Sequence, residues 1–164
     1  MAKFKVGDGI AKYIDSLEAL SEATTDTIGE AIFAGAAIVT DRIRSELESV
    51  PIESRRIKAG SGDMLTGLSK SQKEGLLSSL GIAHMTVSDG VYNVKVGVDG
   101  YNSTRTKTWP NGQPNALIAR SMESGTSFRA KNPVFSRATR AARDEAEKAM
   151  AEAFDEAIEK RINF

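Results

Sequence analysis

The chain has no cysteine, and its 164 residues include a single histidine, a single tryptophan and four prolines. Without cysteine, disulfide bonds, thiolate catalysis, iron–sulfur clusters and cysteine-type zinc sites are excluded. The histidine, His84, has no second histidine and no nucleophile motif to act with, so we interpret it as a polar strand-edge residue rather than a metal ligand or general base. We therefore expect no catalytic residues, no metal and no cofactor, and we expect that the protein is not an enzyme.

The chain also lacks net charge and long apolar runs. Its 22 basic residues equal its 22 acidic residues, which disfavours a nucleic-acid binder or a polybasic membrane-surface protein as a description of the whole chain but leaves local patches open. No apolar run approaches the ~18 residues of a membrane span, and the N-terminus lacks the apolar core of a signal peptide. We expect synthesis in the cytoplasm and no membrane association.

The patterning predicts one α+β domain over residues 1–164, with a long N-terminal and a long C-terminal helix packed on a small antiparallel β-sheet and with long exposed loops. Its parts are a helical region 1–50, a flexible polar loop 51–66, a mixed region 67–132 and a C-terminal helix 133–164. Within the first region the helical period falters at residues 21–27 and then resumes up to Pro51, which ends the helix. Small residues around Gly35 indicate that another helix packs closely there.

The mixed region carries the β signal. Ser71 and Glu74 form a capping-box pattern that opens a short helix, and Gly81 is expected to end it. Two alternating runs, 84–88 and 91–98, then flank Asp89-Gly90, which predicts a β-hairpin with one face covered by the helices. A polar loop, 99–113, follows and carries Trp109, which either folds back on the core or contacts a partner.

After that loop the sequence indicates a helix, a stop and a second helix. Pro114 suits the first position of a helix, and Gly125 suits the left-handed conformation that ends one. A basic loop without helical period occupies residues 126–131. Asn132 and Pro133 then predict the start of the last long helix.

The same stretch resembles a known family. LIARSMESGT at residues 117–126, followed by NPVFSRA at 132–138, resembles the signature of the gene-product-ten-like head–tail joining (tail completion) proteins of long-tailed bacteriophages. The segments 66–69, 77–82 and 94–102 follow the family's order as well. The chain departs from the family at Val134, where an aromatic residue is more usual, and at Ser136–Ala138, which lacks the frequent second proline.

The resemblance implies a non-catalytic virion structural protein at the phage neck. Such a protein forms a homo-oligomeric ring, a hexamer or dodecamer, between the head connector or stopper and the tail tube or terminator, and DNA passes through its lumen. The resemblance thus places it in the virion, at the head–tail interface. The residues we assign to a subunit or partner interface are Trp109, Met122, Glu123, Gly125, Thr126, Phe128, Arg129, Arg137, Arg140 and Arg143.

The charge of three of these arginines supports the assignment of that interface. Arg137, Arg140 and Arg143 form a strip at the positive end of a helix dipole, an unfavourable position that calls for a compensating anion. We expect acid from an adjacent copy, at 145–156 or near Glu46, in preference to DNA phosphate. We also expect the loops 51–66 and 99–113 to be mobile in the free subunit and to become ordered on assembly.

One alternative does not depend on the resemblance. The chain would then be a small cytoplasmic nucleic-acid-binding or regulatory α+β protein that uses the basic patch at residues 129–143. Oligomer size separates the two hypotheses, because a ring subunit forms hexamers or larger assemblies and a regulator is more often a monomer or dimer.

Overall fold

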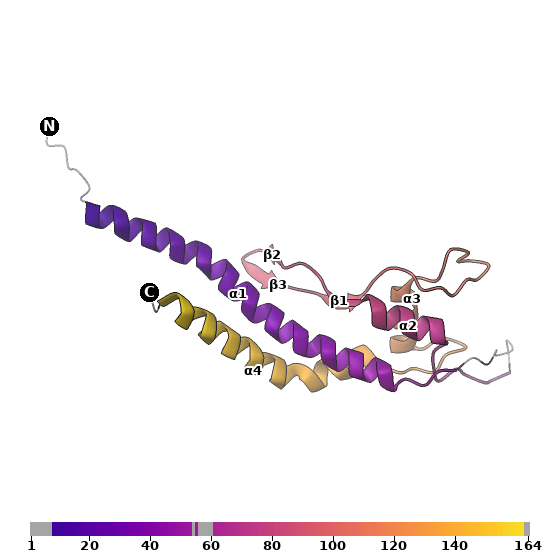
Figure 1. The fold of residues 1–164 in the computed structure, drawn as a ribbon. Coiled ribbons are helices and arrows are strands. Elements are labelled where there is room, and N and C mark those ends of the chain that lie inside the picture. The colour runs from indigo at the N-terminus through magenta and orange to yellow at the C-terminus, as the bar shows by residue number, and fades with distance from the viewer. Residues whose placement is uncertain (1–7, 54, 56–60, 163–164) are drawn as a thin grey trace.

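The computed structural model describes residues 8–53, 55 and 61–162, and among these it describes the side chains only between residues 24 and 160. The chain has the α+β architecture that its sequence predicts, with two long helices against small antiparallel strand pairs (Figure 1). The elements, in order, are α1 Asp8–Ser49, α2 Lys70–Ser79, β1 Leu80–Ile82, β2 Thr86–Ser88, β3 Val91–Asn93, β4 Val96–Val98, α3 Asn115–Ser124 and α4 Val134–Ile162.

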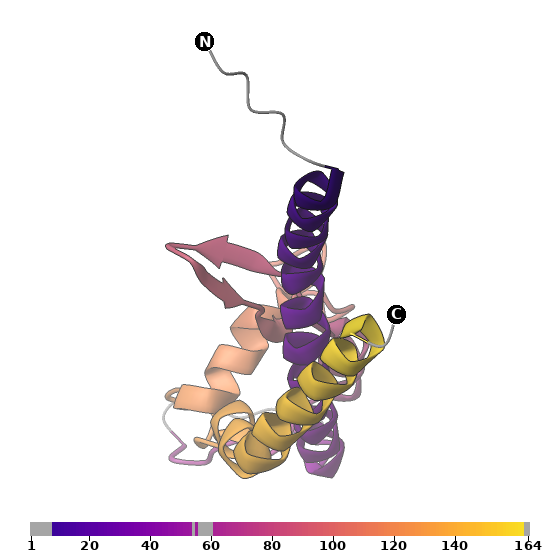
Figure 2. The same cartoon turned by 90° about the vertical axis from the view of Figure 1, so that its left-hand side faces the viewer.

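The two long helices lie side by side and run in opposite directions, and the start of α1 extends past the end of α4 (Figures 1 and 2). The faltering hydrophobic period at residues 21–27 does not interrupt the helix, because α1 is one helix of 42 residues. Adding a residue to an existing helix costs far less than starting a new one, so a short polar stretch between two helical segments continues the helix. Within that stretch Thr27 is buried, which shows that α1 is already packed there.

The close approach predicted at Gly35 is confirmed. A Cβ atom at this position would lie 2.5 Å from Cγ of Met150 and 3.1 Å from the carbonyl oxygen of Ala146, both on α4. The absence of a side chain therefore lets α4 contact the backbone of α1.

The cap of α2 differs from the prediction. Ser69, not Ser71, is the N-cap, and its side chain accepts a hydrogen bond from the backbone of Gln72, whose own side chain accepts from the N–H of Ser69. Ser71 instead hydrogen-bonds Thr104 in a distant loop. The helix ends at Ser79 with the extended, buried Leu80 as its C-cap, one residue before the predicted stop at Gly81, which belongs to β1. The Ser69–Gln72 pair and the Ser71–Glu74 pair both fit the capping-box pattern, so the pattern alone does not select between them.

The hairpin at Asp89-Gly90 is confirmed, with both turn residues at positive φ. The expected continuous strand 91–98 is not, since β3 pairs with β2 while β4 pairs with β1. Three residues, 83–85, lie opposite two, 94–95, between the two ladders. This extra residue is a bulge that interrupts the pairing and bends the ribbon. As expected, a helix covers the ribbon, because α1 packs against β1, β3 and β4.

The core lies where the end of α1 meets α2, α3 and the start of α4. Its buried members are Ile43, Leu47, Val50, Leu68, Leu76, Leu80, Ile118, Met122, Val134 and Ala138. Four helices and β1 thus contribute to one apolar cluster at one end of the molecule. No helix within the described ranges is long and apolar enough to cross a membrane.

Candidate subunit interface

Nine of the ten predicted interface residues lie at one place in the fold, on α3, on the segment 125–133 or on the first third of α4. Trp109 lies apart, in the loop between β4 and α3. The structure separates these residues into those that hold the subunit together and those that are free to contact a partner.

Met122 belongs to the first group. Its side chain is 2% exposed and lies in the core cluster, and its carbonyl accepts a hydrogen bond of 2.8 Å from the N–H of Asn132. The prediction that Met122 contacts a partner is therefore wrong. Its position on α3, four residues after Ile118 and on the same helical face, is the signal that indicates burial.

Glu123 caps α4. Its carboxylate accepts hydrogen bonds from the N–H of Phe135 at 3.1 Å and of Ser136 at 2.9 Å, and from the Ser136 hydroxyl. These N–H groups belong to the first turn, where no carbonyl within the helix is available to accept from them. A carboxylate at this end is also favoured by the helix dipole. The anion that we expected from outside the subunit is thus supplied in part by its own α3.

Gly125 and Thr126 form the turn after α3. Gly125 ends the helix at φ 75° and ψ 169°, a backbone conformation that only glycine adopts readily. Thr126 then fixes the loop, because its hydroxyl accepts from the N–H of Arg129 at 3.1 Å and lies 3.4 Å from the N of Phe128. Both residues act on local backbone geometry rather than as contact side chains.

Arg129 is the largest departure from expectation. Its residue surface is 4% exposed, so it cannot belong to a basic surface patch. The guanidinium donates to the carbonyl of Gly67 and, at 3.3 Å, to the side chain of Gln72. The backbone on either side pairs with Leu65, which accepts from Ala130 and donates to Phe128. Burial lowers the pKa of Arg129, and the nearby charge of Glu53 opposes that shift.

Glu53 holds the other side of this junction. Its carboxylate accepts from the N–H groups of Thr66 at 2.7 Å and Gly67 at 2.9 Å, and Arg55 contacts it as well. The hydrogen bonds from Gly67 and Thr66 lower the pKa of Glu53 to about 2. The two ends of the predicted loop 51–66 are therefore anchored, while residues 54 and 56–60 lie outside the described residues.

The three arginines of α4 have different surroundings. Arg137 pairs with Glu46 of α1 at 2.7 Å, so part of the acid that we assigned to a neighbouring copy comes from the same chain. Arg143 pairs with Glu147, one turn further along α4, at 2.9 Å, and this hydrogen bond raises its pKa. Arg140 is exposed and has no ion-pair partner among the described residues. Together with Arg137 it flanks a surface recess of about 460 Å³ over Pro133 and Ala141.

The loop 99–113 is tied down at its base. Asn102 and Asn115 are both buried, and the Asn102 amide donates to the Asn115 side chain at 3.2 Å. The Asn115 amide lies within hydrogen-bonding distance of the carbonyls of Asp99, at 2.8 Å, and Gly75, at 3.1 Å. The expectation of a free loop is therefore wrong at this base. Trp109 is half-buried in a turn whose backbone pairs with Thr106 in both directions at 3.1 Å.

Sequence reasoning missed one apolar surface. A groove of about 410 Å³ opens between α1, β3 and the second half of α4, and we call it the Phe154 groove. It is lined by Ile28, Ala31, Ile32, Tyr92, Met150 and Phe154, with Phe154 37% exposed. Sequence spacing suggests that these residues face a core, but in the fold Ala31 alone of them is buried, and the others are partly or largely exposed.

Comparisons with protein-family models, with characterised proteins and with solved structures found no match. Among the described residues no cluster of three or more His, Cys, Asp or Glu side chains is placed to hold a metal ion. Function is therefore inferred from the surfaces of the molecule.

Proposed function

We propose that the protein is a non-catalytic structural subunit that assembles with copies of itself into a ring, as the phage neck proteins that its sequence resembles do. In that role it joins the head connector to the tail tube and lies in the virion.

The observation that carries the proposal is apolar surface left uncovered at many places between residues 33 and 154. Large apolar side chains that are 37–68% exposed occur on α1, the hairpin, α3, α4 and the connecting loops; they are Phe33, Ile52, Met64, Val87, Val91, Tyr101, Leu117, Phe128 and Phe154. Single exposed apolar residues are ordinary, but a groove such as that at Phe154 marks an interaction site.

The nucleic-acid alternative loses support for a specific reason. Of its patch at 129–143, Arg129 is buried, and Arg137 and Arg143 are paired with carboxylates of the same chain. Neutralised or buried arginines release few counterions from a phosphate backbone, so they contribute little to affinity for nucleic acid.

Native mass spectrometry of the purified full-length chain tests the proposal. We expect a closed assembly of six or more copies, together with the chain's presence in purified particles of the phage that encodes it. A protein that stays monomeric or dimeric at high concentration, and binds DNA with a steep salt dependence, would instead support the regulatory alternative.

A further inference from the structure

The first third of α4 and the part that follows it carry opposite charge. Residues 134–143, the basic end, contain three arginines and no acidic residue, while residues 144–160, the acidic end, contain seven acidic and two basic residues. Ion pairs within the chain account for Arg137, Arg143, Glu147, Glu152 and Glu156. Arg140 at the basic end and Asp155 at the acidic end are both exposed and have no ion-pair partner among the described side chains.

At each charged end of α4 an apolar feature is exposed. At the acidic end, Asp155 follows Phe154 and lies one turn after Ala151, another residue that lines the Phe154 groove. At the basic end, the loop that leads into α4 presents Phe128, an aromatic side chain that is 50% exposed. The acidic end thus offers an apolar groove and an unpaired carboxylate, and the basic end offers an exposed aromatic ring on the loop before the helix and an unpaired guanidinium in the second turn of the helix.

Within one subunit the charged group at one end of α4 cannot contact the charged group at the other end. Arg140 and Asp155 are 15 residues apart on a continuous helix, a separation of about 22 Å at a rise of 1.5 Å per residue. A second copy removes this restriction, because its acidic end can reach the basic end of the first. The charges match in sign, and aromatic side chains that fill apolar pockets are typical anchors of protein interfaces.

We propose that copies of this chain dock head to tail, with Phe128 of one copy in the Phe154 groove of the next and Arg140 paired with Asp155 of that neighbour. The contact joins two different surfaces, so each docked copy leaves one of each surface free for a further copy. Such an interface produces a ring when the repeated rotation from copy to copy returns to the first copy, and an open filament when it does not. This inference rests on the proposed function, because it names the surfaces through which the proposed ring forms.

A charge-swap experiment tests the polar half of the contact. In analytical ultracentrifugation of the full-length chain, Arg140→Glu and Asp155→Arg should each weaken self-association by about tenfold, because each places like charges together. The double variant, Arg140→Glu with Asp155→Arg, should recover association because it restores an opposite pair with the signs exchanged. Arg105→Glu, the same charge change on the exposed loop 99–113, is the matched control and should leave association unchanged.

The apolar half has its own pair of variants. Phe128→Ser should weaken association by about tenfold or more, whereas Leu117→Ser, at an exposed apolar position on α3 that lies outside the proposed contact, should not weaken this contact. Thermal unfolding of every variant checks that the subunit remains folded.

The outcomes separate this contact from the ring itself. A wild-type ring that persists unchanged in Arg140→Glu and Phe128→Ser would overturn the contact and leave the proposed function standing. Single variants that weaken association without recovery in the double variant would overturn the Arg140–Asp155 pair. Open chains of wild-type protein with the predicted charge-swap recovery would support the contact and overturn the closed ring.

Discussion

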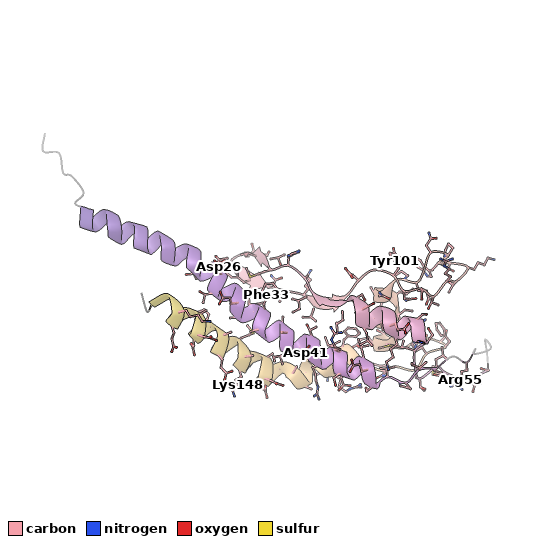
Figure 3. All side chains as sticks on the ribbon, viewed as in Figure 1. Asp26, Phe33, Asp41, Arg55, Tyr101 and Lys148 are labelled. Atoms are coloured by element: carbon pink, nitrogen blue, oxygen red, sulfur yellow. The ribbon has the colours of Figure 1, made fainter. Side chains whose placement is uncertain are left out.

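At one end of the molecule α2, α3 and the start of α4 are joined by a buried apolar cluster and by side-chain hydrogen bonds to backbone groups, whereas at the other end α1 and α4 pack mainly through small residues. We call these the junction end and the paired-helix end. Arg55 and Tyr101 lie at or near the junction end and Asp26 lies at the opposite one (Figure 3).

The two ends differ in how many of their polar and apolar groups have partners inside the subunit. At the junction end, Glu123, Arg129 and Asn115 find their partners inside the subunit. At the paired-helix end the Phe154 groove and Asp155 have no such partners among the described residues. The residues first assigned to an interface are thus largely those that stabilise the fold, apart from the exposed Phe128 and Arg140, and the unfilled groove lies elsewhere.

Removing a buried amide from the junction end should have the largest effect on stability. Asn115 is 2% exposed, and its loss leaves the carbonyls of Gly75 and Asp99 without that donor. Each unsatisfied buried group costs about 1–3 kcal/mol, so we expect Asn115→Ala to lower the free energy of unfolding by about 3 kcal/mol in urea titrations. Asn111→Ala, on the exposed loop, is the control and should change stability little. Equal effects of the two substitutions would contradict a structural role for the buried amide.

The same substitution made at both ends compares their packing directly. A Cβ at Gly75 would lie 2.5 Å from Cβ of Asn102 and 2.7 Å from Oδ1 of Asn115, which are held in a hydrogen-bonded network. A Cβ at Gly35 would meet chiefly the side chain of Met150, which has three rotatable bonds and adapts easily. We expect Gly75→Ala to destabilise by about 2 kcal/mol and Gly35→Ala to change stability by less than about 1 kcal/mol, because the helix propensity of alanine offsets the crowding. Thermal unfolding that ranks the two in the opposite order would show that the paired-helix end is the more rigid.

The cap of α4 should contribute less to the free energy of unfolding than Asn115 or Gly75. Glu123→Ala removes the acceptor for the N–H groups of Phe135 and Ser136, and we expect a loss of about 1 kcal/mol in chemical denaturation. Glu145→Ala removes the same charge from an exposed position in the middle of α4 and serves as the control. A loss in both variants of the same size would indicate that charge alone, rather than capping, matters.

The smallest effect concerns the pH dependence that Glu53 introduces. The pKa of its carboxyl lies at about 2, below the ordinary value of 4.5, so the ionised group stabilises the folded state above pH 4.5. This contribution is lost as the pH falls from about 4.5 towards 2. The melting temperature of Glu53→Gln should therefore lie below that of the wild type at pH 7, and the difference should shrink as the solution is acidified. A difference that stays constant from pH 7 to pH 3 would contradict this role.

Local patterns predicted the elements well where one local rule was sufficient. Asp89-Gly90 needs only a tight turn with positive φ, and Gly125 only a helix end, and both are found. Pro114 is found at the N-cap of α3, one position before the expected one, which is within the usual uncertainty of helix ends. The small residues around Gly35 likewise predicted close helix packing, because the absence of a side chain has a direct steric consequence.

Sequence could not assign the roles of charged residues near the α3–α4 junction. Arg129 stands in a basic run that resembles a surface patch, and its burial depends on the backbone pairing of Leu65 with residues far away in the chain. Glu123 looks like a solvated helix end until α4 turns back and places its first turn against the carboxylate. Partners separated by ten or more residues in sequence leave no periodic signal.

The sequence by itself therefore determined the element order, the α+β class and the opposite charges of the first third of α4 and the part that follows it, since these follow from residue spacing and composition along the chain. The tertiary structure alone decided which charges are neutralised, where the β ribbon is interrupted and which apolar residues remain uncovered. The physical reason is that burial and ion pairing are properties of positions in space, and residues as distant as Glu46 and Arg137 meet only after the helices have packed.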